Sequence, residues 1–246
     1  MGLSYQLDDG YGAQGRLGLI VLSTDETLEN EARRIVAGRP VSLLHARIPA
    51  EPEVTPEALK TMEGHMSATA ALLPKGLDAV GYGCTSGATV IGPARVAALI
   101  GAVQDQAAVT NPLSAVLAAL AALQASRIAL LTPYLESVNQ PLIAALDQAG
   151  IDVVVQASFL QSDDWTVARI TEEDTLSAVK SIGNTKDCDA IFASCTNLRT
   201  LGILQQAEAA TGLPVVSSNL ALIWHMLKLA GVDARGWGPG RLISCT

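Results

Sequence analysis

Two short stretches of the sequence look like copies of each other, and both lead into a cysteine. The first is residues 78–86 (DAVGYGCTS) and the second is residues 189–197 (DAIFASCTN). Each begins with Asp-Ala, continues through a short, largely apolar segment and ends in Cys, Thr and a small polar residue. Cys84 and Cys195 therefore occupy equivalent positions of a repeat. Two thiols placed in this way predict paired acid–base or nucleophilic chemistry.

The side chains that follow each cysteine could support such chemistry. Each cysteine is followed by two residues with hydroxyl or amide groups, which are Thr85, Ser86, Thr196 and Asn197. With the loop amides they could bind a carboxylate and stabilise the enediolate formed when a proton leaves the neighbouring carbon. One thiolate would remove that proton, and the opposite thiol would return one. Alternatively, one thiolate adds to an activated double bond, the bond rotates, and the thiolate leaves again.

Alternating strand and helix patterns position the two cysteines. The apolar segments before them are typical of buried parallel strands, and ligands bind at the carboxyl edge of such sheets. Further strands are predicted at residues 16–22, 41–48, 107–109, 127–132, 152–157 and 214–216. Helices are predicted at residues 28–36, 55–73, 91–100, 113–123, 137–146, 172–182, 201–211 and 221–229.

The spacing of these elements indicates an internal duplication. Cys195 follows Cys84 by 111 residues, and Arg127 follows Arg16 by the same 111 residues at the start of each half's first strand. We therefore predict an α/β fold of two pseudo-symmetric lobes, each a parallel sheet flanked by helices. The predicted parts are a tail at 1–15, a first lobe at 16–112, a second lobe at 113–220, and a C-terminal helix and tail at 221–246 that packs back on the first lobe.

Composition excludes several classes of protein. A net charge of −8 over 246 residues leaves no basic surface for a nucleic-acid partner. No apolar run is long enough to cross a membrane, and residues 1–14 lack the apolar core of a secretion signal. The four cysteines have neither zinc-type nor C-x-x-C spacing, so we expect no metal and a reducing, cytoplasmic location.

Several motifs together resemble the aspartate/glutamate racemase superfamily, closest to its branch of maleate cis-trans isomerases, arylmalonate decarboxylases and racemase-like proteins of ectoine utilisation. The motifs are GCTSG at 83–87, TPY at 132–134 followed by Val138-Asn139, SCTNLRT at 194–200, and PVVSS at 214–218. The resemblance extends from Arg16 to Arg241. It implies a homo-oligomeric enzyme without a cofactor that acts on a small carboxylate substrate. It also implies that Cys84 and Cys195 are catalytic, and that Thr85, Ser86 and Tyr134 bind the substrate carboxylate or stabilise the enolate.

Two departures from this resemblance guide the choice of reaction. Decarboxylases of the branch have Gly in place of the first cysteine, so Cys84 disfavours decarboxylation. Maleate isomerases typically have Asn where Asp25 and Asp164 align, and two carboxylates would repel a dicarboxylate. We therefore expect a racemase or isomerase that acts on a small amino-acid-like acid, with Asp25 and Asp164 binding substrate. The alternatives are maleate isomerisation by covalent addition of a cysteine and, less favoured, arylmalonate-type decarboxylation or a non-enzymatic small-molecule sensor.

Other residues with reactive or charged groups are expected to be structural. The three histidines, His45, His65 and His225, are scattered, and none is expected to be catalytic. Trp165 adjoins Asp164 and either lines the pocket or packs elsewhere. Arg199 is expected to have a structural role.

Overall fold

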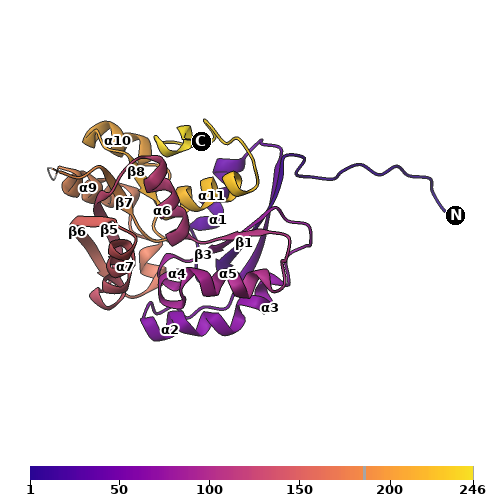
Figure 1. Ribbon diagram of the computed structural model, residues 1–246, viewed down its shortest axis with the longest axis horizontal. Coiled ribbons are helices and arrows are strands. Elements are labelled where there is room, and N and C mark those ends of the chain that lie inside the picture. The colour runs from indigo at the N-terminus through magenta and orange to yellow at the C-terminus, as the bar shows by residue number, and fades with distance from the viewer. Residues whose placement is uncertain (185–186, 246) are drawn as a thin grey trace.

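Two four-stranded parallel sheets form the framework of the protein (Figure 1). The structure is a computed structural model that describes residues 1–184 and 187–245. The strand orders are β2-β1-β3-β4 and β6-β5-β7-β8, so the two sheets have the same topology. This arrangement confirms the predicted fold class of two similar α/β lobes.

The strands lie close to their predicted positions. The first sheet contains β1 (Gly15–Leu22), β2 (Val41–Ile48), β3 (Ala79–Gly83) and β4 (Ala108–Thr110). The second contains β5 (Arg127–Tyr134), β6 (Asp152–Gln161), β7 (Ala190–Ala193) and β8 (Val215–Ser217). Strands β3 and β7 are buried along their whole length, as expected for central strands covered by helices on both faces.

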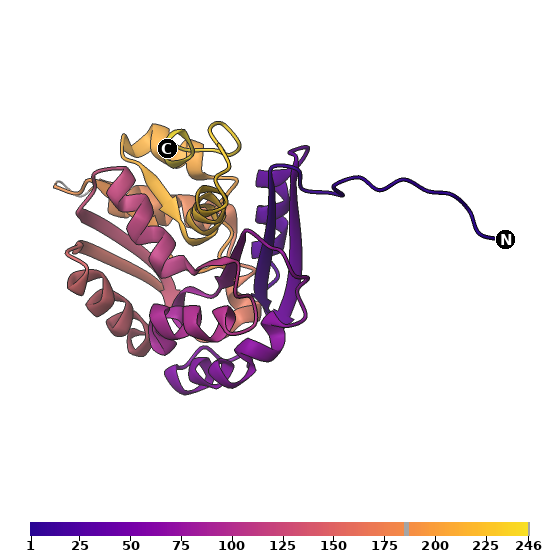
Figure 2. The same ribbon diagram turned by 45° about the vertical axis from the view of Figure 1, so that its right-hand side comes forward.

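Helices connect successive strands and cover the sheets (Figure 2). They are α1 (Leu28–Val36), α2 (Pro56–Thr61), η1 (Met62–His65), α3 (Met66–Ala70), α4 (Thr85–Ile91), α5 (Pro93–Gly101), α6 (Pro112–Ala122), α7 (Glu136–Gln148), α8 (Asp164–Val167), α9 (Glu172–Gly183), α10 (Leu204–Thr211), α11 (Ser218–Leu229) and η2 (Leu242–Ser244). None of the helices in the described residues is long and apolar enough to cross a bilayer.

The structure differs from the sequence prediction at several places. The helix predicted at 55–73 is divided into α2, η1 and α3, although Thr55 does cap its start. The residues after Cys84 form helix α4 instead of a loop, a helix that the sequence hides because TSGATV contains several weak helix formers. Strand β5 continues through Pro133 to Tyr134, so Tyr134 ends a strand where a loop was predicted.

Helix α11 links the two lobes. It follows β8 of the second sheet, yet it packs against α1, α6 and β3. Residues 1–10 lie outside any helix or strand and extend away from the rest of the protein (Figure 2). The domain boundaries given above stay a prediction, and Thr246, the last residue of the predicted C-terminal segment, lies outside the described residues together with Thr185 and Lys186.

Candidate active site

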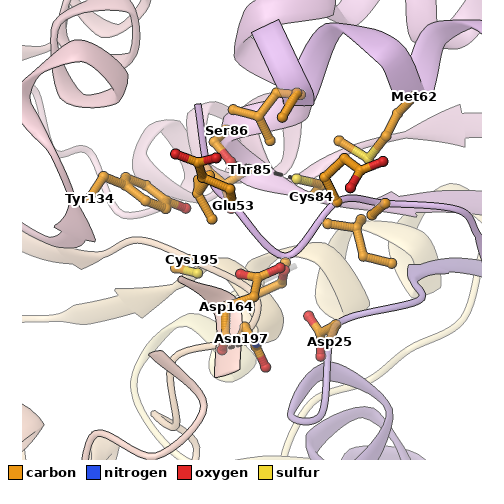
Figure 3. A pocket seen from close by; sticks show the side chains of 17 residues that line it. Asp25, Glu53, Met62, Cys84, Thr85, Ser86, Tyr134, Asp164, Cys195 and Asn197 are labelled. Atoms are coloured by element: carbon orange, nitrogen blue, oxygen red, sulfur yellow. Dashed lines mark hydrogen bonds between the residues drawn. The ribbon is translucent and has the colours of Figure 1, made fainter. Parts of the chain in front are cut away.

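The two cysteines meet in one pocket between the lobes. The pocket has an empty volume of about 430 Å³ with its mouth included. All nine residues selected from the sequence line it, namely Asp25, Cys84, Thr85, Ser86, Tyr134, Asp164, Cys195, Thr196 and Asn197. Figure 3 shows the side chains of Cys84 and Cys195 on different sides of this space.

Sequence reasoning missed the remaining lining residues, most of which come from the segment between β2 and η1. They are Leu22, Ala50, Glu51, Glu53, Val54, Ala58, Leu59 and Met62. The bridge between Glu53 and Asp163 brings this segment to the second lobe. The sequence held no signal for these positions, because that segment reaches the pocket only when the two lobes pack together.

Cys84 ends β3 and caps helix α4. Its Sγ accepts a hydrogen bond from the Gly87 amide at 3.2 Å and lies 3.6 Å from the Ser86 hydroxyl. Gly87 is tightly enclosed, since a Cβ there would lie 2.9 Å from Cys84 Sγ and 2.5 Å from the Tyr82 hydroxyl. The thiol is buried, and burial raises its pKa to about 12. Burial therefore favours the neutral thiol form of Cys84 at neutral pH.

Cys195 lies in an unusual backbone conformation just after β7. Its φ is +109°, a region that residues with side chains rarely adopt and that typically costs about 1–3 kcal/mol. The thiol is buried, and burial raises its pKa well above the ordinary range, with the negative charge of Asp164 adding to the effect. Backbone strain of this kind is often found at functional sites, and here it marks Cys195 as a candidate catalytic residue.

One hydroxyl joins the two cysteine segments. Ser218 Oγ accepts hydrogen bonds from the Thr85 hydroxyl at 2.8 Å and from the Cys195 amide at 3.1 Å. Ser218 is the first residue of α11 and is fully buried. The sequence prediction left Ser218 between the strand at 214–216 and the helix at 221–229, and the PVVSS motif was the only signal for it. Helix α11 thus holds both thiol-bearing segments from one point.

Carboxylates give the pocket a negative charge. Asp25 Oδ1 accepts from the amides of Thr27 and Leu28, both at 2.8 Å, while its Oδ2 has no hydrogen-bond partner among the described residues. Burial raises the pKa of Asp25 to about 6. Asp164 accepts from the Thr24 hydroxyl at 2.5 Å, and burial raises its pKa too.

The pocket lining contains no countercharge. Glu51 and Glu53 add two more acidic side chains, and the lining among the described residues includes no Lys, Arg or His. The arrangement therefore attracts a positively charged group and repels an anion.

The polar residues beside the thiols differ in whether their side chains already have hydrogen-bond partners. The hydroxyl of Tyr134, at the end of β5, is buried without a partner in the described part of the chain. Thr196 donates its hydroxyl to the Gly83 carbonyl at 3.3 Å. The Asn197 amide donates to the Asp164 carbonyl at 2.9 Å and accepts from the Glu26 amide at 2.9 Å. Tyr134 is thus available to a ligand, whereas Asn197 mainly ties the lobes together.

Trp165 and Arg199 lie outside the pocket. Trp165 is 60% exposed and stacks with the Arg169 guanidinium, 4.0 Å from the ring centre, so it packs at the surface and does not line the pocket. Arg199 donates to the carbonyls of Arg169 and Ile170. No cluster of three or more metal-ligating side chains occurs within residues 1–184 and 187–245.

Comparison with known proteins gives a consistent picture. The family model described as arylmalonate decarboxylase matches residues 17–243. A maleate isomerase of Nocardia farcinica is 25% identical over 238 residues, which cover 93% of this chain and 95% of that protein.

Two solved structures are similar along nearly the whole chain. A variant of the maleate isomerase Iso from Pseudomonas putida S16 with maleate has a TM-score of 0.84 and 26% identity, covering 94% of this chain and 98% of the other. A variant of the Nocardia farcinica maleate cis-trans isomerase with a covalently bound succinylcysteine intermediate has a TM-score of 0.83 with the same identity and coverage.

Proposed function

Because the chain belongs to the arylmalonate decarboxylase family, we propose that it is an isomerase in which Cys84 and Cys195 act at the carbon next to a carboxylate. The family assignment confirms the resemblance seen in the sequence. The maleate isomerases to which the chain is similar support an isomerase that uses cysteine chemistry on a small carboxylate. The finer proposal is racemisation of a small amino-acid-like acid without a cofactor, with the two cysteines as an acid–base pair.

The observation that carries this proposal is the pairing of two buried thiols in one acidic pocket. Each thiol follows an equivalent central strand, so the pseudo-symmetry of the lobes supplies one proton-transfer group from each side. A thiolate on one side would remove the proton from the carbon next to the carboxylate. The neutral thiol on the other side would return a proton to the opposite face, which inverts the configuration.

The charge of the pocket favours an amino group on the substrate. An ammonium could bind between Asp164 and the unpartnered Oδ2 of Asp25. Its positive charge would also favour the thiolate form of a neighbouring cysteine, which burial strongly disfavours. Substrate binding would in this way supply the charge that makes the base reactive.

Hydroxyl groups on the other side would bind the substrate carboxylate. Ser86 and Tyr134 line the pocket beside the thiols, and the Tyr134 hydroxyl has no partner among the described residues. Hydrogen bonds from these groups would stabilise the enediolate formed when the proton leaves. Thr85 has a supporting role, because its hydroxyl already donates to Ser218.

A second candidate is cis-trans isomerisation of maleate by covalent addition. The succinylcysteine in the Nocardia farcinica relative favours it, because addition of a thiolate to maleate gives a carbanion whose protonation yields that adduct. In this reaction one cysteine is the nucleophile, and no second cysteine is needed to remove a proton from the substrate. The four acidic side chains of the pocket oppose it, since maleate carries two negative charges.

Proton NMR in D₂O separates the two candidates. The enzyme would be incubated with acidic amino acids, N-acetylated diaminobutyrate and maleate. Racemisation replaces the hydrogen next to the carboxylate by deuterium, and the replacement should be lost in both Cys84→Ser and Cys195→Ser. Conversion of maleate to fumarate without deuterium at carbon would establish the second candidate instead.

A third cysteine variant provides the matched control. Cys245→Ser changes a cysteine that lies outside the pocket lining, so it should retain full turnover. Undiminished exchange in either Cys84→Ser or Cys195→Ser would refute the paired roles. The homo-oligomeric state stays a prediction that light scattering would test.

A further inference from the structure

The strained backbone at Cys195 must be held by interactions elsewhere. A residue other than glycine keeps a φ of +109° only when several surrounding interactions together hold its backbone in that conformation. Residues 194–203 between β7 and α10, which we call the Cys195 loop, contain no regular helix or strand. The loop therefore depends on partners from other elements for its shape.

Several of those partners come from α1 and its preceding loop and from α11, and others are the carbonyls of Gly83, Asp164, Arg169 and Ile170. The Cys195 amide donates to Ser218, and the Thr196 carbonyl accepts from Asn219 Nδ2 at 2.9 Å. Further along, the amides of Thr200 and Leu201 both donate to Glu31 Oε1, at 2.7 and 2.8 Å. Glu31 lies on α1, which belongs to the first sheet's side of the protein and packs against α11 (Figure 1).

Glu31 sits at the centre of this network. Its Oε2 accepts from Asn219 Nδ2 at 2.8 Å and from the Thr200 hydroxyl at 3.3 Å, so the carboxylate receives four hydrogen bonds. The side chain is only 4% exposed and does not line the pocket. Its four hydrogen bonds offset the cost of burying a carboxylate, and they satisfy the Thr200 and Leu201 amides, which an apolar residue at this position would leave without an acceptor.

We propose that Glu31 is a positioning residue that holds the Cys195 loop, and through it the Cys195 thiol, in its strained conformation. The inference rests on the proposed role of Cys195. Asn219 completes the connection, because its Nδ2 joins Glu31 to the carbonyl next to Cys195. Glu31 does not touch the substrate, so its effect reaches the reaction only through the position of this one thiol.

The test compares the alkylation of the two pocket thiols in the full-length protein. Glu31→Gln keeps the size of the side chain but replaces one carboxylate oxygen by an NH₂ group. This donor would face other donors, either the Thr200 and Leu201 amides or the Asn219 side chain. Iodoacetamide labelling followed by peptide mass spectrometry gives separate rates for Cys195 and Cys84. We expect the ratio of the Cys195 rate to the Cys84 rate to rise about fivefold, the effect of one lost hydrogen bond.

Glu208→Gln is the matched control. Glu208 is also a buried carboxylate that accepts from backbone amides, those of Val215 and Arg241, each at 3.0 Å, and in the described residues its side chain has no hydrogen bond to the Cys195 loop. Loss of stability alone would expose both thiols and leave the ratio unchanged. An unchanged ratio in Glu31→Gln, or the same rise in Glu208→Gln, would overturn the proposal.

A milder variant covers the case in which Glu31→Gln does not fold. Thr200→Val removes the single hydroxyl donor to Glu31 with little change of shape, and should raise the same ratio by a smaller factor. No shift of the ratio in a folded Thr200→Val would then contradict the role of Glu31. The labelling needs no turnover, so failure of this inference is distinguishable from failure of the proposed reaction.

Discussion

Replacement of Asp164 by Asn should make the Cys195 thiol more reactive, which is the reverse of the usual effect of an active-site substitution. Asp164 lines the pocket with both thiols, and its negative charge is the largest contribution after burial that raises the pKa of Cys195. Burial is also the main cause of the raised pKa of Cys84, but there the hydrogen bonds with Ser86 and the Gly87 amide, which lower the pKa, have larger effects than the charge of Asp164. Asn keeps the acceptor for the Thr24 hydroxyl, so the change removes charge and little else.

The size of the effect follows from how a nearby charge acts on a buried thiol. Loss of one neighbouring like charge should lower the pKa of Cys195 by about one unit. Below the pKa, each unit changes the thiolate fraction tenfold, so alkylation near pH 8 should become about ten times faster. The increase at Cys84 should be smaller. Burial persists in the variant, so the pKa of both thiols stays above that of an exposed cysteine.

Site-resolved alkylation across a pH series measures this prediction. The matched control is Asp163→Asn, which removes a charge of the same sign one residue away, at a half-buried helix cap that Asn can also form. The control should leave the Cys195 rate nearly unchanged. A Cys195 rate that stays constant or falls in Asp164→Asn, or an equal increase in the control, would show that the acidic pocket does not suppress this thiol.

Two further predictions concern Asp25 and Gly87. Asp25→Asn should stabilise the fold above pH 6. The pKa of Asp25 rises from 3.8 to about 6 on folding, so the native state loses ~3 kcal/mol of stability as pH rises through this range. Urea unfolding at pH 7.5 should show the gain in stability of the variant, and at pH 3.5, below both pKa values, the gain should vanish. Gly87→Ala should lower turnover about a hundredfold by displacing the Cys84 thiol. Gly101→Ala, where a Cβ meets nothing within 4 Å, should not, and equal activity of the two variants would argue against that reasoning.

The sequence determined the elements and the reactive residues of this protein. The repeat around Cys84 and Cys195 and the 111-residue spacing predicted two similar α/β lobes, because strand and helix patterns report which face of each element is buried. Cysteines that follow central parallel strands must lie at the carboxyl edges of their sheets, whatever the details of packing. Thr85, Ser86, Thr196 and Asn197 directly follow the cysteines and share that edge, whereas Asp25, Tyr134 and Asp164 were selected from the family resemblance; all nine line the pocket.

Tertiary structure alone decided how these residues are held and what charge surrounds them. Glu31 and the Cys195 loop are about 170 positions apart in the chain, and Ser218 reaches Thr85 across 133 positions. Glu51 and Glu53 join the pocket only because their segment crosses to the other lobe. Such contacts depend on how the lobes and α11 pack against one another. The apolar periodicity of a segment indicates which of its faces is buried, but it does not indicate which distant segment packs against that face.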